Sequence, residues 1–171
     1  MNVESVEPKD RSALLAIAVR TGLFSTDDAE ALLGGVLDGI FAATLPAGHM
    51  ALACRPGPAA AIAGWTYFAP DQYAEGVWNV WWLGVSPESI GTGVGQKLLR
   101  AAEARAHGAG ARIIVVETSS RAPQARARAF YAKEGYAECG CVPDFYGDGD
   151  HKVIFSRRPR KTEPAVAVAS G

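Results

Sequence analysis

The sequence contains few cysteines, no long apolar run and almost no net charge, and each absence excludes a class of protein. Three cysteines among 171 residues are too few for a disulfide framework or a complete zinc site. Seventeen basic and eighteen acidic residues nearly cancel, so the composition indicates neither a nucleic-acid-binding surface nor a polybasic membrane anchor. Every apolar stretch is far shorter than the roughly eighteen residues that span a bilayer. We therefore expect no nucleic acid, membrane or metal as a partner.

The start of the chain and its thiols both bear on the compartment. The first ten residues, MNVESVEPKD, lack the apolar run behind a basic start that marks a signal peptide. Unpaired thiols at Cys54, Cys139 and Cys141 are typical of a reducing compartment. We therefore predict a cytoplasmic protein.

The composition is typical of a packed globular protein, with 49% hydrophobic and 20% charged residues. A chain of 171 residues is long enough for one domain in which a sheet carries helices on both faces. The end of the chain lacks the large apolar side chains that would offset the entropy of ordering it. We predict a single domain over residues 1–160 and a flexible tail over residues 161–171.

Apolar periodicity and turn residues divide the chain into strands and helices. Runs of β-branched and aromatic residues predict strands over residues 2–6, 50–55, 60–68, 76–85, 112–117, 136–146 and 152–156. Apolar stripes at helical spacing predict one helix that begins at Pro8 and others over residues 26–43, 96–107 and 124–134. Strands first, followed by alternating strands and helices, favour a mixed sheet in an α/β architecture.

Two adjacent glycines, Gly34 and Gly35, weaken the predicted helix over residues 26–43 by about 1 kcal/mol each relative to alanine. A helix softened in this way is either a mobile cover over a site or a segment that packs closely against its neighbours. The sequence leaves both interpretations open, and close packing is the more common of the two.

The most informative segment, residues 83–99, joins a buried strand to a helix through three alternating glycines, Gly91, Gly93 and Gly95. Because glycine has no Cβ, the backbone N–H groups of such a turn are able to converge on one point. The partial positive charge at the helix N-terminus adds to them. The segment therefore predicts a site for a phosphate or pyrophosphate group.

Other phosphate-binding turns fit this segment less well. A P-loop ends in Gly-Lys-Ser/Thr, whereas Lys97 here lies between Gln96 and Leu98. A dinucleotide-binding turn requires glycine where Gln96 stands and usually follows the first strand of its fold, although Glu117 is placed like a ribose-binding acid. A dinucleotide-binding fold is therefore the second hypothesis, and a turn without a ligand is the third.

The same segment resembles the coenzyme A loop of the GNAT acetyltransferase superfamily, Arg/Gln-x-x-Gly-x-Gly/Ala after a strand that ends in Val-x-Pro. Val85-Ser86-Pro87 is similar to that lead-in, and Gly93 and Gly95 match the final Gly-x-Gly. Ile90 departs from the Arg or Gln of the first position. The chain then lacks one of the family's side-chain contacts to the cofactor, unless basic residues in the first turns of the helix replace it.

A second resemblance lies downstream. Residues 130–136, Phe-Tyr-Ala-Lys-Glu-Gly-Tyr, resemble the family's Phe/Leu-Tyr-x-x-x-Gly-Phe/Tyr segment, and Gln124 stands where the family often has an Asn that contacts pantetheine. Residues 117–120 (Glu-Thr-Ser-Ser), residues 143–146 (Pro-Asp-Phe-Tyr) and Gly149-Asp150 resemble a bacterial subgroup. The chain is identified as a member of the superfamily over nearly its whole length.

This resemblance implies a GNAT-like α/β fold, a central mixed, mostly antiparallel sheet with splayed middle strands and helices on both faces. It also implies acetyl-CoA as the cosubstrate, without a metal. The residues implied to bind the cofactor are Leu83, Gly84, Val85, Gly91, Thr92, Gly93, Val94, Gly95, Gln96, Gln124 and Tyr131.

Amide formation from a thioester requires a neutral amine, a polarised carbonyl group and a leaving thiolate that becomes protonated. The resemblance implies that Tyr131 is the general acid that protonates the thiolate. It also implies that a backbone N–H near Gly84 stabilises the oxyanion, an effect of about 3–4 kcal/mol in other acyl-transfer sites.

The general base is open among several acids and a histidine. Glu117 closes a buried strand, where apolar surroundings would favour its protonated form, and some family members that acetylate protein N-termini place a Glu similarly. A purely structural role for Glu117 is equally well supported. Asp144, Asp150 and His151, near the closing hairpin, are the alternatives.

Three functions are compatible with the sequence. The first is an N-acetyltransferase, in which a primary amine of a small molecule or peptide attacks acetyl-CoA directly in a ternary complex. The second is a non-catalytic acyl-CoA-binding module, and the third is a dinucleotide-dependent oxidoreductase. Aromatic residues on the acceptor side favour a compact, partly apolar amine, and a homodimer is one assembly state to be tested.

Overall fold

The computed structural model describes residues 1–57 and 60–158, and one seven-stranded sheet runs through this part of the chain. The strands lie in the order β1-β2-β3-β4-β5-β7-β6, and only β4 and β5 are parallel. This confirms the predicted mixed, mostly antiparallel sheet. The predicted tail lies outside the described residues. The strands are β1 (Asn2–Ser5), β2 (Met50–Arg55), β3 (Gly64–Pro70), β4 (Val77–Val85), β5 (Ile113–Ser119), β6 (Ala137–Gly147) and β7 (Asp150–Arg157).

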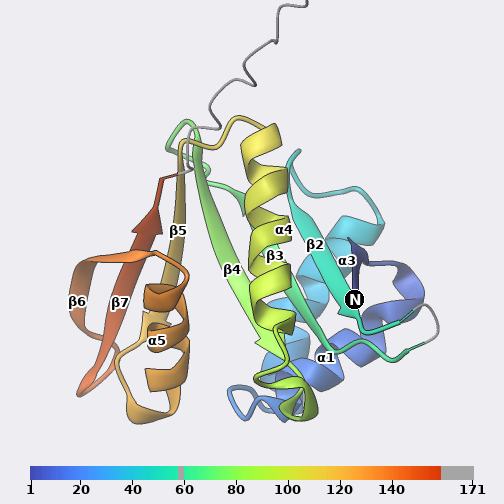
Figure 1. Cartoon of the computed structure of the whole chain (residues 1–171), viewed down its shortest axis with the longest axis horizontal. Helices are drawn as coiled ribbons and strands as arrows, with labels where there is room; N and C mark the ends of the chain where they lie inside the picture. The colour runs from blue at the N-terminus through green and yellow to red at the C-terminus, as the bar shows by residue number, and fades with distance from the viewer. Residues whose placement is uncertain (58–59, 159–171) are drawn as a thin grey trace, which may run out of the picture.

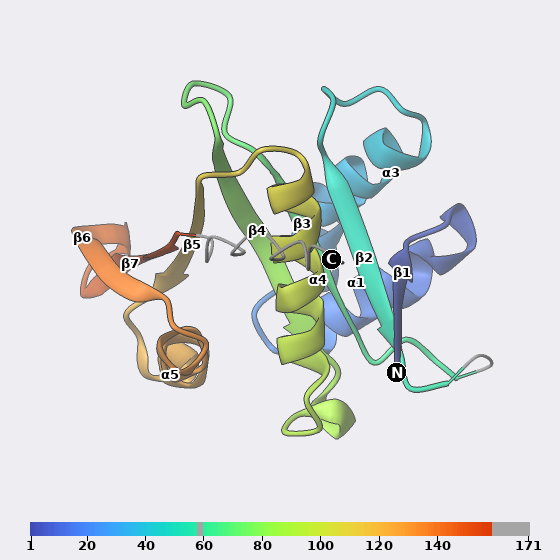
Figure 2. The same ribbon diagram turned by 45° about the horizontal axis from the view of Figure 1, so that its top comes forward.

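Helices cover both faces of the sheet, as the resemblance implies (Figures 1 and 2). On one face lie α4 (Val94–Gly108) and α5 (Ala125–Lys133), and on the other lie α1 (Arg11–Arg20), α2 (Thr26–Ala29) and α3 (Gly35–Phe41). A π-helical turn over Glu30–Gly34 joins α2 to α3, and 3₁₀ turns at Pro8–Asp10, Pro87–Ser89 and Ala122–Gln124 precede α1, the glycine-rich turn and α5. The α1–α3 layer covers β1 to β4, and among the described residues no helix covers that face of β5, β7 and β6.

The strand predicted over residues 60–68 begins instead at Gly64. Its antiparallel partner β2 ends at Arg55, immediately before Pro56, which has no N–H group to donate to the ladder. Regular pairing between the two strands therefore starts at Cys54 opposite Gly64, and before it the Ala63 N–H still donates to the Cys54 carbonyl at 2.8 Å.

The predicted second helix forms with a π-helical turn in its middle. Gly34 lies at the end of that turn, and a Cβ added there would come within 2.9 Å of the Arg11 guanidinium nitrogen Nη2. Arg11 is held in place by Asp38, whose Oδ1 accepts a hydrogen bond from Nε at 2.6 Å. Close packing is therefore found at Gly34, whereas Gly35 is exposed and a Cβ added there would meet no atom within 4 Å.

The two faces of the sheet have separate hydrophobic cores, and a β-bulge in β4 switches side chains between them. Trp78 and Val80 pack in the core beneath α4 and α5, whereas Trp82 packs in the core beneath α1 to α3. In the ladder with β3, Trp82 pairs with Tyr67 but Val80 with the next residue, so Trp81 is the extra residue of the bulge.

Beyond the bulge, β4 and β5 separate. Their parallel ladder runs from Val77 opposite Ile113 to Val80 opposite Val116 and then ends. The rest of β4 pairs with β3 alone, and the rest of β5 pairs with β7 alone. We call this divergence the fork. It is visible in Figure 1 as the widening space between the two strands. The predicted splayed middle strands are confirmed.

Gly84 is predicted to be required for packing at the fork. A Cβ added there would overlap the ring of Trp82, which is confined between Trp65 and Phe24 with ring centroids 5.7 and 5.4 Å away. Gly84→Ala should lower the free energy of unfolding by about 1–3 kcal/mol, measured from denaturant midpoints. The control is Gly140→Ala, where the new Cβ would meet Ile154 at an ordinary 3.6 Å. Equal midpoints for the two variants would contradict the prediction.

Candidate active site

The glycine turn, residues 91–95, leaves the N-terminus of α4 open. Gly91 and Gly93 have φ of 83° and 88°, a left-handed conformation that side chains disfavour. No side chain caps the helix at Gly93, and the first helical hydrogen bond joins the Lys97 N–H to the Gly93 carbonyl at 3.0 Å. The N–H groups of Val94, Gly95 and Gln96 precede that bond and so have no acceptor within the helix. The turn thus has the open amides and helix dipole that an anion requires.

Side chains next to the glycine turn are engaged with Glu134, a buried residue after α5. The Gln96 amide donates to Glu134 Oε1 at 2.8 Å, and Arg100 Nη2 donates to Oε2 at 2.9 Å. Gln96 is therefore left with its backbone N–H for a cofactor. Arg100 is already paired, so it is not free to serve in place of the Arg or Gln side chain that the family has where Ile90 stands.

The fork provides a second set of unpaired backbone groups. Leu83, Gly84 and Val85 pair with β3 on one side, and among the described residues no strand pairs with their opposite edge. Leu83 and Val85 are partly buried against the core beneath α4. This edge of β4 is available to an extended ligand that enters between the strands.

Tyr131 lies on α5 and is buried in the core beneath α4 and α5, with 7% of its surface exposed. Its ring packs against Tyr136 and Phe155, with centroids 5.9 and 6.1 Å away. Burial raises the pKa of the Tyr131 phenol above its usual value, so the group stays protonated at neutral pH. A protonated phenol is the form that a proton donor needs. Gln124, the last residue of the 3₁₀ turn before α5, is half-buried.

Glu117 points to the opposite face of the sheet from Tyr131. Alternate residues of β5 face the α4 and α5 layer, so Val115 and Glu117 face away from it. The expected apolar surroundings are not found, because Lys152 Nζ lies 2.7 Å from Glu117 Oε2. Neither Lys152 nor the bulge at Trp81 was found from the sequence, since both depend on strand register.

A pocket of about 300 Å³ lies on this face at the fork. We call it the fork pocket, and its lining residues are Asn79, Val80, Trp81, Val115, Glu117, Phe145, Tyr146 and Lys152. Its lining includes Val80, the last residue of β4 that pairs with β5, and Glu117, the first residue of β5 beyond that ladder. The fork pocket therefore opens on the place where the two strands separate.

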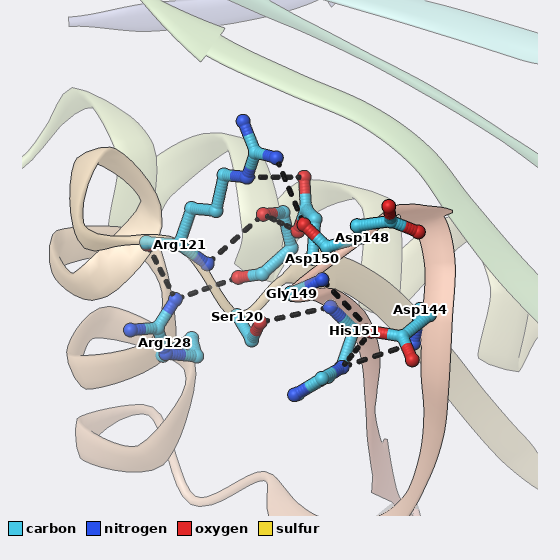
Figure 3. Close-up of polar contacts among 9 residues, drawn as sticks. Ser120, Arg121, Arg128, Asp144, Asp148, Gly149, Asp150 and His151 are labelled. Carbon is cyan, nitrogen blue, oxygen red and sulfur yellow. Dashed lines mark hydrogen bonds and ion pairs between the residues drawn. The ribbon is translucent and has the colours of Figure 1, made fainter.

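The β6–β7 hairpin, which carries one wall of the fork pocket, is tied to the end of β5 (Figure 3). The Asp150 carboxylate accepts a hydrogen bond from the Ser119 hydroxyl and forms an ion pair with Arg121, whose Nε lies 3.3 Å from Oδ2. The Asp144 carboxylate accepts the Gly149 N–H at 2.8 Å, and His151 Nδ1 accepts the Asp144 N–H at 2.9 Å. The three alternative bases thus take part in contacts that shape the hairpin.

Two further hydrogen bonds lie at the end of β5, one to the hairpin and one to α5. The Ser120 hydroxyl accepts the His151 N–H at 2.9 Å, and Arg128 Nη1 donates to the Ser119 carbonyl at 2.6 Å (Figure 3).

Among residues 1–57 and 60–158, no helix is long and apolar enough to cross a membrane. In the same residues, no three His, Cys, Asp or Glu side chains are grouped to hold a metal ion.

The sequence model of the Acetyltransferase (GNAT) family matches residues 27–136, which include the glycine turn and Tyr131. The chain belongs to this family. It is thus an acetyltransferase by family, and its fork and open helix N-terminus lie within the matched residues. No curated protein sequence matches this GNAT acetyltransferase.

Solved structures share the fold of this GNAT acetyltransferase. A protein from Desulfovibrio desulfuricans, described as a GNAT-family acetyltransferase, is 24% identical with a TM-score of 0.80, and the match covers 92% of this chain and 96% of that one. An aminoglycoside 6′-N-acetyltransferase solved with coenzyme A is 16% identical (TM-score 0.73, covering 94% and 99%). The ribosomal-protein-S18-alanine N-acetyltransferase from Escherichia coli is 17% identical (TM-score 0.67, covering 95% and 98%). At these identities the likeness establishes the fold and leaves the substrate open.

The buried phenols predict a loss of stability at alkaline pH. Burial raises the pKa of both Tyr131 and Tyr136 in the folded state. The contribution of these two phenols to the free energy of unfolding is therefore complete below about pH 10, the pKa of tyrosine in the unfolded chain. It is lost as the pH rises above that value. In denaturant unfolding from pH 8 to 11, Tyr131→Phe should reduce this alkaline decline, whereas Tyr73→Phe, at a site 90% exposed, should not. If Tyr131→Phe lost stability at alkaline pH as steeply as the unsubstituted protein, the Tyr131 phenol would not be the source of the decline.

Proposed function

We propose that this protein is an N-acetyltransferase that transfers the acetyl group of acetyl-CoA to a primary amine of a small molecule or peptide. The observation that carries the proposal is the position of an uncapped helix N-terminus beside a fork between two parallel strands. The first offers amides to a diphosphate, and the second offers a free strand edge to an extended chain.

The residues present fit acetyl-CoA in two places. The N–H groups of Val94, Gly95 and Gln96 would hold the pyrophosphate, with Gly91 and Thr92 completing the turn. The free edge of Leu83, Gly84 and Val85 would hold the pantetheine arm, and Gln124 on the facing element would add an amide contact. Bound there, acetyl-CoA supplies an activated acyl group.

The chain's own groups would move the protons. An alkylammonium has a pKa near 10, so only about one amine in a thousand is neutral at pH 7. Glu117 in the fork pocket would take the proton of the bound ammonium. Tyr131 on the other side of the sheet, which is protonated at neutral pH like any phenol, would give a proton to the leaving sulfur. A backbone N–H at the fork would hold the developing oxyanion.

Direct transfer to the amine is the route that the fork pocket supports. None of the eight lining residues is Ser or Cys, the nucleophiles that would form a covalent acyl intermediate. The amine nitrogen would bond to the acetyl carbon as the carbon–sulfur bond breaks, and the second proton that the nitrogen loses would return the Tyr131 phenolate to its protonated form. A homodimer and a cytoplasmic location stay predictions.

The oxidoreductase hypothesis does not fit the topology. Dinucleotide-binding folds have a parallel sheet and place the glycine turn after the first strand. Here the turn follows β4 of a mostly antiparallel sheet. The non-catalytic alternative differs from the proposal only in turnover, so the experiments below measure binding and turnover separately.

Coenzyme A binding is the first test of the proposed function. Titration calorimetry with coenzyme A should give saturable heat well below millimolar ligand, because the open amides need no rearrangement. Gly93→Ala should weaken binding about 5- to 30-fold, because a Cβ at φ 88° costs about 1–2 kcal/mol, which the free turn relieves by changing its conformation and which binding must restore. Gly108→Ala, at the far end of α4, is the control and should bind normally. No heat at millimolar coenzyme A would refute the proposal.

Tyr131→Phe tests the assigned proton donor. It should lower kcat for acetyl transfer about 10²- to 10⁴-fold, the usual contribution of a general acid, while the affinity for coenzyme A is nearly kept. Thiol release measured against a library of primary amines reports turnover, and calorimetry reports affinity. Tyr73→Phe serves as the matched phenol control. Unchanged turnover in Tyr131→Phe would show that another group protonates the sulfur.

A further inference from the structure

The fork pocket contains one positive and one negative side chain. Of its eight lining residues only Glu117 and Lys152 are charged, and their groups lie 2.7 Å apart. Asp150 in the adjoining hairpin is already paired with Arg121 at 3.3 Å. The fork pocket therefore carries no net charge of its own, and its two charges are adjacent.

Lys152 is held at the wall of the fork pocket. Its ammonium lies 3.6 Å from the centroid of the Phe145 ring, and only 15% of its side chain is exposed. A cation over an aromatic face and beside a carboxylate has a defined position. Lys152 thus differs from a surface lysine, whose ammonium moves freely in water.

Three aromatic side chains line the rest of the fork pocket while remaining open to solvent. Trp81, Phe145 and Tyr146 are 54%, 52% and 49% exposed. They are three of the nine large hydrophobic residues that are exposed among the described residues, and all three line one pocket. Apolar surface gathered in a concave site indicates a ligand that covers it.

We propose that the acceptor is a free α-amino acid with an aromatic or large apolar side chain, an inference that rests on the proposed acetyl transfer. Its ammonium group binds Glu117, its carboxylate binds Lys152, and its side chain lies against Trp81, Phe145 and Tyr146. An α-amino acid has both charged groups on one carbon, which matches two adjacent protein charges. A pocket of about 300 Å³ is at the small end for ligand sites, which suits such a molecule.

Charge balance during the reaction separates this acceptor from other amines. When Glu117 takes a proton from the ammonium, both groups become neutral, and Lys152 still has the ligand carboxylate as its partner. With a simple amine, Lys152 repels the arriving ammonium and then keeps no anion after the proton transfer. A peptide N-terminus has an amide in place of the carboxylate, so it too leaves Lys152 without an anionic partner after the proton transfer.

Three amines that share a phenyl ring and a primary amine test the role of the carboxylate. Thiol release from acetyl-CoA is measured with L-phenylalanine, L-phenylalaninamide and phenethylamine. We expect kcat/KM for phenylalanine to exceed the other two at least about 10-fold, the worth of one charge-assisted hydrogen bond. Equal or better turnover of the two amines without a carboxylate overturns the amino-acid proposal and leaves acetyl transfer intact. Coenzyme A binding without turnover of any amine in a broad library overturns both.

Substitutions at Lys152 separate recognition from a structural role. Lys152→Gln should lower kcat/KM for phenylalanine about 10- to 100-fold, mainly through KM, and should not lower kcat/KM for phenylalaninamide, whose ammonium Lys152 repels. Lys152→Arg, which keeps the positive charge, should retain most of the activity toward phenylalanine. Coenzyme A titration confirms that each variant is folded. An equal loss for both substrates in Lys152→Gln would show that Lys152 only supports the structure, and would overturn the proposal.

Discussion

The separation of β4 and β5 beyond Val80 is the constraint on which the rest of this structure depends. Adjacent strands normally satisfy each other's backbone groups, and unpaired groups in the interior are costly. Here the ladder ends at Val80 opposite Val116, and each strand keeps only its outer partner. Among the described residues the free edge of β4 has no strand partner, and in the proposed function its main-chain atoms would hold the cosubstrate.

A buried polar network fixes the two helices that flank the fork. Glu134 accepts hydrogen bonds from Gln96 and Arg100 of α4, and Arg157 of β7 donates to the Glu134 carbonyl at 3.0 Å. Glu103 of α4 accepts from the Tyr136 hydroxyl at 2.9 Å. Because the buried carboxylates have partners, the network stabilises one arrangement of the glycine turn relative to the end of α5. The ring of Tyr131 on that helix packs in the same region, against Tyr136 and Phe155.

The opposite face of the sheet is shaped by a hairpin rather than by helices. Among the described residues, α1 to α3 cover only the first four strands, and the β6–β7 hairpin supplies Phe145, Tyr146 and Lys152 to the open part. The contacts of Asp150 with Ser119 and Arg121 hold the hairpin against the end of β5, and the contacts of Asp144 lie within the hairpin. One face of the sheet thus carries the Tyr131 phenol and the uncapped N-terminus of α4, and the other carries a small aromatic pocket with a charged pair.

Most elements of the fold could be predicted from the sequence, because their signals are local. The apolar runs of β4 and β5 indicate buried strands, and the alternating glycines ending at Gly95 indicate a backbone turn before a helix. The strand predicted from residue 60 begins four residues later, since the end of its partner at Pro56 matters more than its own composition.

The candidate site was only half predictable. The sequence by itself determined the glycine turn and the segment around Tyr131, because each is a contiguous run of residues that can be recognised without knowing how the chain packs. Tertiary structure alone decided that Lys152 meets Glu117 and that Trp81 lies at a bulge, because strand register sets which side chains share a face. It also decided that the fork exists, since the end of the ladder between β4 and β5 is a property of two strands that the whole of α4 separates in the sequence.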